Sequence, residues 1–203
     1  MDKFRNKYRI QSNRLQNWNY GWNASYFITI CTQNRTEFFG EIIGDEMVLS
    51  GIGGIVKNEW VKTPKIRADM NIILDAFVVM PNHFHAIITI GKNEYNAGRN
   101  VERYGYDGVF DNDCCRNAMH RVSTNINNPK NQPKNKFGPQ SKNLASIIRG
   151  FKSAVTIHAR KINPVFVWQS RYYDHIIRDN KSFQRIRNYI INNPKHWDDD
   201  KFT

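Results

Sequence analysis

Short runs of β-branched and aromatic residues, separated by turn residues, predict the strands of this protein. The runs are 26–32 (YFITICT), 41–49 (EIIGDEMVL), 72–79, 83–90, and a last region made of 166–168 and 172–177. Gly44-Asp45 lies in the middle of the second run, which is therefore typical of a hairpin. Met80-Pro81-Asn82 joins the next two runs and indicates a tight turn.

Apolar residues recur at helical spacing in three other segments. Ser50 is a suitable N-cap for a helix over about 52–62, which Thr63-Pro64 should end. A second helix is predicted over 144–161, with an apolar stripe on one side and basic residues on the other. A third is predicted over 180–192, before a proline that cannot continue it.

The order of the predicted elements defines a fold class. Apart from the small hairpin, the order is β α β β α β, followed by one more helix. This is the order of the ferredoxin-like split βαβ arrangement, in which an antiparallel sheet has two helices on one face. We therefore predict an α+β protein with a ferredoxin-like antiparallel sheet and an additional C-terminal helix. The second face of the sheet is predicted to stay open.

The chain of 203 residues is long enough for one well-filled core and too short for two ordinary domains. Residues 1–21 are basic and polar with scattered aromatic rings, and we interpret them as an N-terminal arm. The single domain is predicted to span 22–203. A long insertion at about 92–142 interrupts it, because this segment is rich in Asn, Gly, Pro and Lys and has little apolar periodicity.

The chain is strongly basic. It has 30 Lys and Arg residues against 18 Asp and Glu residues, a formal net charge of +12, together with 9 Tyr, 5 Trp and 12 Phe. Because cations attract phosphates and flat rings stack on bases, single-stranded nucleic acid is the favoured partner. The alternative is that most rings belong to the core and most charges to a solvated surface.

Cysteine usage and hydropathy indicate the compartment. The three cysteines, two of them adjacent, fit no disulfide framework and no paired zinc-ligand spacing. No apolar run approaches the roughly 18 residues of a membrane span, and the N-terminus has no apolar signal core. We therefore expect a cytoplasmic, nucleoid-associated protein with no membrane association.

Two histidines, His83 and His85, stand one residue apart on a predicted strand. Because side chains alternate across a strand, both imidazoles lie on one face, while Phe84 and Ala86 lie on the other, under the helices. Two imidazoles at this spacing are close enough to bind one cation on the open face. An HxH pair alone is more often a pair of ordinary hydrogen-bonded histidines, and a metal site needs a third ligand.

The last predicted helix offers such a ligand. Its apolar stripe is formed by Phe183, Ile186 and Ile190. Tyr189 and Asn193 are four residues apart, so both can point to the same edge of that face. The Asn193 amide oxygen can bind a cation, and the Tyr189 phenol is a nucleophile once it loses its proton. The plainer interpretation is an interface tyrosine and a C-cap asparagine, and Pro194 disfavours helical dihedrals at Asn193.

Together these features resemble the single-tyrosine HUH transposases, most closely the REP-associated tyrosine transposases. In that name H-U-H means two histidines around a hydrophobic residue, here His83-Phe84-His85. The resemblance runs over about 22–202, through YFITICT, DAFVVMPNHFHAIITI, SIIRGFKSAV, VWQSRYYDHIIR and RIRNYIINNPKHW. The insertion and the N-terminal arm depart from the family pattern, but neither removes a candidate site residue.

The resemblance implies a metal-dependent enzyme that cleaves and rejoins single-stranded DNA beside a hairpin. It places the ligands of Mg²⁺ or Mn²⁺ at His83, His85 and Asn193, and the nucleophile at Tyr189. Attack of the tyrosine on phosphorus would give a 5′-phosphotyrosine and a free 3′-hydroxyl, and a 3′-hydroxyl can reseal the strand without ATP. The resemblance is compatible with a monomer and with a homodimer.

Basic side chains near these positions are the expected phosphate contacts. They are Arg149, Lys152, Arg171, Arg178, Arg185 and Arg187. Rings such as Trp18, Trp22 or Tyr172 are expected to stack on bases. For each single arginine the alternative is a solvated surface charge.

Three other functions stay open at this point. A domesticated transposase would bind DNA without cleaving it. A metal-dependent nuclease would use the histidines to activate water, with Tyr189 only stacking or donating a hydrogen bond, and would turn over without a covalent intermediate. A plasmid relaxase or replication initiator would use the same chemistry, although one tyrosine and a small size favour the transposase branch.

Overall fold

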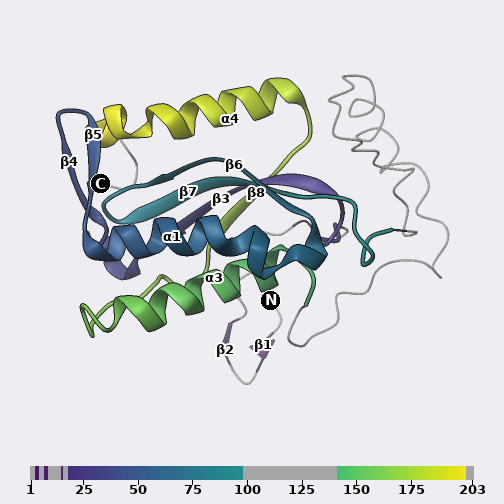
Figure 1. Ribbon diagram of the computed structural model, residues 1–203, viewed down its shortest axis with the longest axis horizontal. Helices are drawn as coiled ribbons and strands as arrows, with labels where there is room; N and C mark the ends of the chain where they lie inside the picture. The colour runs from purple at the N-terminus through teal and green to yellow at the C-terminus, as the bar shows by residue number, and fades with distance from the viewer. Residues whose placement is uncertain (1–2, 5–6, 9–14, 16–17, 98–140, 200–203) are drawn as a thin grey trace.

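The computed structural model describes residues 3–4, 7–8, 15, 18–97 and 141–199 (Figure 1). Most of the predicted insertion, 98–140, and most of the predicted N-terminal arm lie outside the described residues. Within the arm, two short strands, β1 (Lys3–Phe4) and β2 (Lys7–Tyr8), pair in antiparallel orientation.

A four-stranded antiparallel sheet forms the centre of the molecule. Its strands are β3 (Ala24–Cys31), β6 (Ile72–Val79), β7 (His83–Ile90) and β8 (Tyr173–Ile177), in the spatial order β6-β7-β3-β8. Each of the predicted runs 26–32, 72–79, 83–90 and 172–177 contributes one of these strands. Residues 166–168 contribute only an isolated bridge between Trp168 and Thr32.

In the described part of the chain, three α-helices accompany the sheet, at the predicted places. They are α1 (Gly51–Ile66), α3 (Leu144–Ala159) and α4 (Asn180–Asn192). The order β3, α1, β6, β7, α3, β8 is the βαββαβ order inferred from the sequence. The other elements among the described residues are the hairpin strands β4 (Gly40–Ile43) and β5 (Glu46–Leu49) and the 3-10 helices η1 (Gln33–Arg35), η2 (Ala68–Met70) and η4 (Asn193–Asp199).

Local turn and cap chemistry explains several boundaries. Gly44 and Asp45 both have positive φ, 57° and 64°, as a two-residue hairpin turn between β4 and β5 requires. The Ser50 side chain accepts a hydrogen bond from the Gly53 amide at 3.1 Å, which confirms it as the N-cap of α1.

The predicted end of α1 at Thr63-Pro64 is wrong. The helix continues to Ile66 with Pro64 inside its last turn. A proline there removes only the amide that would bond to the carbonyl of Trp60. The Arg67 amide donates to the carbonyl of Thr63 at 3.1 Å, so the last turn keeps this hydrogen bond.

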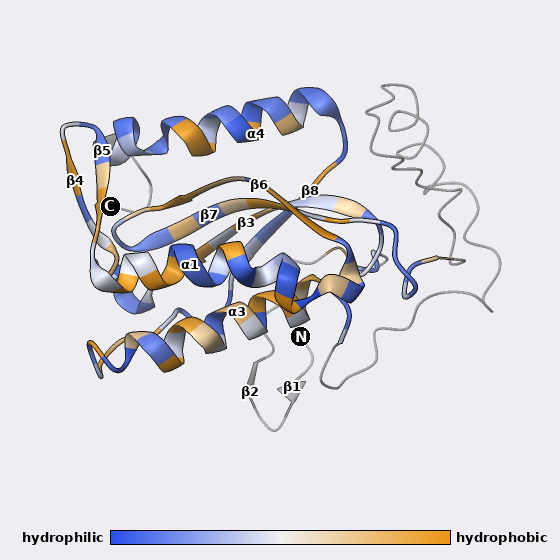
Figure 2. Ribbon diagram, viewed as in Figure 1, coloured by the Kyte–Doolittle hydropathy of each residue, from blue (hydrophilic) through white to orange (hydrophobic). Residues whose placement is uncertain are grey.

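The main core lies between one face of the sheet and the helices α1 and α3, which Figure 1 shows together on that side. Phe84, predicted to face the helices, is fully buried there, and its ring lies 5.0 Å from that of Trp60 on α1 and 5.5 Å from that of Phe151 on α3. Arg67 joins the two helices by donating to the carbonyl of Ser146 at 2.8 Å. Figure 2 shows the hydrophobic stretches of β6 and β7 that line these layers.

The second face of the sheet is covered in part, which corrects the prediction of an open face. Helix α4 lies on it, opposite α1 and α3 (Figure 1). The apolar stripe of α4 packs in a second core cluster formed by Ile87, Ile177, Phe183, Ile186 and Ile190. An amphipathic helix must bury its apolar stripe against another element, and the sheet face provides the surface.

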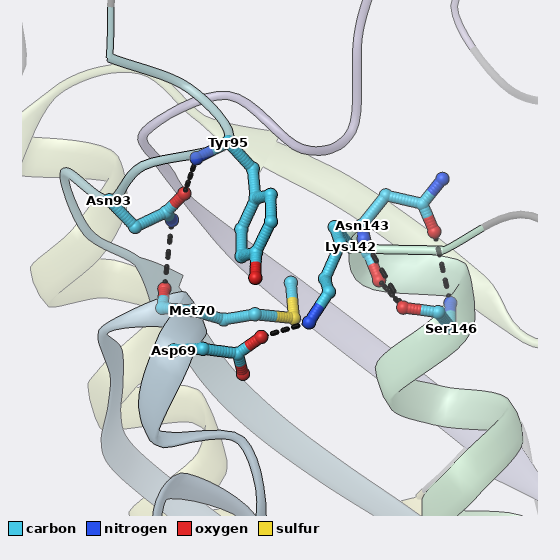
Figure 3. Close-up of polar contacts among 7 residues, drawn as sticks. All are labelled: Asp69, Met70, Asn93, Tyr95, Lys142, Asn143 and Ser146. Atoms are coloured by element: carbon cyan, nitrogen blue, oxygen red, sulfur yellow. Dashed lines mark hydrogen bonds and ion pairs between the residues drawn. The ribbon is translucent and has the colours of Figure 1, made fainter.

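The two ends of the predicted insertion lie close together (Figure 3). Lys142 pairs with Asp69, and its ammonium lies 4.4 Å from the centre of the Tyr95 ring. On the other side of the insertion Asn93 donates to the carbonyl of Met70 at 3.0 Å. The described residues at the two ends of the insertion therefore lie together beside η2.

Candidate active site

His83 and His85 lie side by side on β7, with ring centroids 4.5 Å apart. Their exposed fractions are 0% and 1%, so the predicted position on an open sheet face is wrong. The C-terminal elements cover them: the Trp197 ring of η4 stacks 6.0 Å from that of His83, and the Tyr189 ring of α4 lies 5.3 Å from that of His85. The imidazoles therefore occupy a largely dry space between the sheet and the last helix.

His85 links the sheet to Tyr189. Its Nδ1 lies 2.8 Å from the Thr29 hydroxyl, and its Nε2 lies 3.2 Å from the hydroxyl of Tyr189. Thr29 is the cross-strand partner of His85 on β3, so strand register places this contact. Tyr189 is 44% exposed, so part of the residue faces solvent beside the buried imidazole.

His83 is oriented by the turn before β7. Its Nδ1 lies 2.9 Å from the side-chain oxygen of Asn82. Because an amide oxygen only accepts, the proton in this contact is on Nδ1, and Nε2 of the neutral ring carries the lone pair. The main-chain carbonyl of Asn82 accepts from the amide and the hydroxyl of Thr32, both at 2.9 Å, which holds the turn to the end of β3.

Asn193 lies at the C-cap of α4 and is 2% exposed. Its dihedrals, φ −56° and ψ −40°, are helical although Pro194 follows, so the local preference against helix gives way here. A side-chain hydrogen bond between Asn193 and His83 raises the pKa of His83, which places the two groups in contact. The structure thus brings together all four candidate residues, His83, His85, Tyr189 and Asn193.

Burial keeps both imidazoles neutral. It lowers the pKa of His83 to about 3, although the hydrogen bond with Asn193 acts in the opposite direction. Burial also lowers the pKa of His85 well below its usual range, and the neighbouring His83 adds to this effect. The neutral imidazole is the form that binds metal ions, so neither ring has to lose a proton first at neutral pH.

The donor set fits a divalent catalytic ion. Among the described residues, no group of three or more His, Cys, Asp and Glu side chains is arranged to hold a metal. A site here would therefore combine two imidazole nitrogens with the amide oxygen of Asn193, an atom buried in the same space. Three neutral ligands leave positions for water and phosphate oxygens, which suits Mg²⁺ or Mn²⁺ better than a closed structural zinc site.

The six expected phosphate-binding residues are divided between the two sides of the sheet. Arg149 and Lys152 belong to α3, on the side opposite α4 (Figure 1). Lys152 donates to the carbonyl of Gln169 at 2.5 Å, and burial lowers its pKa to about 8. These two residues face a different surface from Tyr189.

The other four basic residues are on or near β8 and α4. Arg171 precedes β8 and is exposed. Arg187 forms an ion pair with Asp75 of β6 at 3.1 Å, which fastens α4 to the sheet. Arg178 and Arg185 are exposed and both lower the pKa of His175, so they lie near this exposed residue of β8. Arg178 and Arg185 are therefore the cations best placed for a strand that reaches Tyr189.

Two of the rings expected to stack on bases belong to the protein interior instead. Trp18 and Tyr172 are partly buried and pack against the main core. Trp18 also donates to the Tyr26 hydroxyl at 3.1 Å, and the Trp22 ring meets that of Trp18 edge-on at 5.2 Å. On β8 alternation directs the next residue, Tyr173, to the opposite face, where it is 53% exposed.

Sequence reasoning missed three residues that shape the site: Thr29, Asn82 and Trp197. Asn82 directly precedes the first histidine, and its position in the turn is the only local signal. Thr29 is recognisable only when the register between β3 and β7 is known. Trp197 reaches His83 because η4 continues directly from α4, which no periodicity indicates.

Comparison with solved structures defines the class of fold. A REP-associated tyrosine transposase bound to a REP hairpin superposes with a TM-score of 0.51 and 18% identity, over 92% of this chain and 74% of that one. A provisionally named transposase from Deinococcus radiodurans R1 gives a TM-score of 0.39 and 12% identity, over 91% of this chain and 97% of that one. The first similarity shows a transposase-like fold of mixed α and β structure.

At the level of sequence, no family model matches the chain. An uncharacterized protein of Haemophilus influenzae (strain ATCC 51907 / DSM 11121 / KW20 / Rd) is 37% identical over 195 residues, which is 94% of this chain and 91% of that protein. The chain belongs to the family of this protein. In the part of the chain that the structure describes, no helix has the length and apolar character needed to cross a membrane.

Proposed function

We propose that the protein is a metal-dependent DNA nicking and joining enzyme, a tyrosine transposase of the HUH type, that acts on single-stranded DNA beside a hairpin. The observation that carries the proposal is the contact of the Tyr189 hydroxyl with His85 Nε2 at 3.2 Å, next to His83 and Asn193. The transposase-like fold supports it, and so does the REP hairpin bound to the similar transposase.

The proposed chemistry is a transesterification at phosphorus. The Tyr189 oxygen forms a bond to phosphorus, the bond between phosphorus and the 3′ oxygen breaks, and the leaving oxygen takes a proton from water. The phenolic proton passes to solvent, and 44% of the tyrosine is exposed. The products are a 5′-phosphotyrosine and a 3′-hydroxyl, and attack by a 3′-hydroxyl reverses the step.

His83, His85 and Asn193 would hold the divalent ion in this proposal. A bound Mg²⁺ or Mn²⁺ supplies polarisation of the phosphate and neutralises charge that develops in the transition state. Thr29 and Asn82 position the two imidazoles by their contacts with the Nδ1 atoms. The Nε2 atom of His85 then faces the Tyr189 hydroxyl of α4.

The arrangement of α4 suits a nucleophile. Ile186 and Ile190 are buried against the sheet, whereas Tyr189 between them stands at the edge of the buried stripe. The helix therefore fixes the backbone of the tyrosine at the border between the buried histidines and solvent. A phosphodiester can approach from solvent while the ligands behind it stay buried.

The test is a denaturing gel of the purified protein incubated with labelled single-stranded hairpin oligonucleotides from around its own gene, with Mn²⁺ or Mg²⁺. A covalent protein–DNA band is expected for the wild type, and its loss is expected for Tyr189→Phe. Tyr95→Phe is the matched control, because it removes the hydroxyl of another exposed tyrosine, beside η2, and should leave the band.

Two other results would contradict the proposal. Cleavage that survives in Tyr189→Phe without a covalent band indicates a nuclease that activates water. Tight binding of each oligonucleotide with no cleavage and no covalent band, with either metal, indicates a non-catalytic DNA-binding protein.

A further inference from the structure

Helix α4 leaves part of the second sheet face exposed at the edge strand β8. It packs mainly against β6 and also contacts β7, and its apolar stripe reaches Phe27 of β3 and Ile177 at the end of β8. In the exposed part, Tyr173 of β8 is 53% exposed and His175 of β8 is exposed, beside the partly buried Phe27. Thr29 pairs with His85 on one side and with Tyr173 on the other, so this surface adjoins the candidate site.

Three aromatic rings connect the surface to the candidate nucleophile. The Phe27 ring meets the Tyr173 ring edge-on at 6.3 Å and the Tyr189 ring edge-on at 6.2 Å. Tyr173 and Tyr189 thus stand on either side of Phe27, and both are about half exposed. Edge-on contacts fix the orientation of the rings while part of each phenol faces solvent.

Two cations border the same surface. Arg178 follows β8 and Arg185 lies on α4, and both lower the pKa of His175. Asp174 and Asp179 act on this pKa in the opposite direction. Asp179 is engaged as the N-cap of α4, accepting from the Ser182 amide at 2.7 Å, and the two arginines act more strongly on the pKa of His175 than the two carboxylates do. The charge that a ligand meets beside the rings is therefore positive.

We propose that Tyr173 is a base-stacking platform for the strand that Tyr189 attacks, with Arg178 and Arg185 contacting its phosphates. This proposal rests on the proposed function for the identity of the ligand. Exposed rings beside cations suit single-stranded DNA, because its unpaired bases are free to leave their neighbours and stack on a side chain. Duplex bases are already stacked, so a duplex offers this surface only its phosphates.

The test measures binding alone. Fluorescence anisotropy with a fluorescein-labelled oligothymidylate of about 12 nucleotides, a length within the usual range of single-strand sites, is recorded in EDTA so that no cleavage occurs. Tyr173→Ala should weaken binding roughly tenfold, since one base stacked on one ring typically contributes that much. Tyr173→Trp should bind at least as tightly as the wild type. Tyr95→Ala, at another exposed tyrosine, should leave binding unchanged.

A second measurement locates the contact. Photocrosslinking with an oligonucleotide that contains 5-iodouracil, followed by peptide mass spectrometry, should give an adduct on the peptide that contains Tyr173. The stacking proposal is overturned if Tyr173→Ala binds the oligonucleotide as tightly as the wild type. It is also overturned if Tyr173→Trp loses binding although this variant unfolds at the wild-type temperature. Neither measurement needs metal or cleavage. If Tyr173 proves to be a stacking platform but no covalent band forms, only the role of Tyr189 as the nucleophile is refuted.

Discussion

Acidification should destabilise the protein through its two buried histidines. In the folded state the pKa of His83 is lowered to about 3 and that of His85 well below its usual range, whereas in the unfolded chain both return to about 6.5. The unfolded state therefore binds protons more readily. The stability that comes from keeping the rings neutral is present above about pH 6.5 and is lost as the pH falls toward the folded-state values.

The magnitude follows from this difference in pKa. Between about pH 7.5 and about pH 5.5, His83 in the unfolded chain becomes largely protonated, while in the folded protein it stays neutral. This costs about 1.4 kcal/mol of unfolding free energy for His83, and His85 should add a similar amount. The carboxylates titrate below this range and contribute little to it.

The assay is urea denaturation in EDTA at both pH values, for the wild type and for His83→Gln. The wild type should lose about 3 kcal/mol on acidification and the variant about half of that. His175→Gln is the control for the third histidine with a lowered pKa, which is more exposed and should contribute less. A wild-type stability that stays flat over this range, or an equal loss in His83→Gln, would refute the reasoning.

Three substitutions test other parts of the structure. Ile190→Ala should lower the unfolding free energy in urea by roughly 2–5 kcal/mol because the side chain is fully buried between α4 and the sheet. Ile191→Ala, at a residue of the same helix that is 54% exposed, should have little effect, and equal losses would disprove this packing. Thr29→Val removes a buried hydrogen bond to the His85 imidazole and should weaken Mn²⁺ binding in calorimetry by roughly 10- to 100-fold. Unaltered Mn²⁺ binding would contradict a positioning role for Thr29. Asn193→Ala should weaken Mn²⁺ binding at least as much, whereas Asn192→Ala should leave it unchanged. Similar Mn²⁺ affinities of these two variants would argue against Asn193 as a ligand.

The elements that the sequence predicted best are those with strong local boundaries. Strands β6 and β7 have the predicted limits because Met80-Pro81-Asn82 interrupts an otherwise continuous apolar segment. Helix α4 has its predicted limits because Asp179 caps its start and Pro194 follows its end. The end of α1 was missed because Pro64 acts on one hydrogen bond of the last turn, where its loss is tolerated.

The surroundings of the histidines were not predictable in the same way. Alternation places His83 and His85 on one face of β7, but periodicity does not say what covers that face. The apolar stripe of α4 was visible in the sequence, and its docking partner was not. The same limit explains the choice of Tyr172 over Tyr173 as a stacking residue, because only the pairing of β8 with β3 decides which of the two faces solvent.

Asn193 illustrates how packing overrides a local rule. A residue before proline tends to leave the helical region, yet Asn193 has helical dihedrals and a buried side chain. Ile190, one turn earlier, is fully buried and fixes the end of α4 against the sheet, and η4 continues the chain from that position. The backbone of Asn193 is thus held between two packed elements, which directs its amide to His83. The burial that sets the pKa of the histidines and the docking that aims Tyr189 and Asn193 therefore have one origin, the apolar stripe of α4.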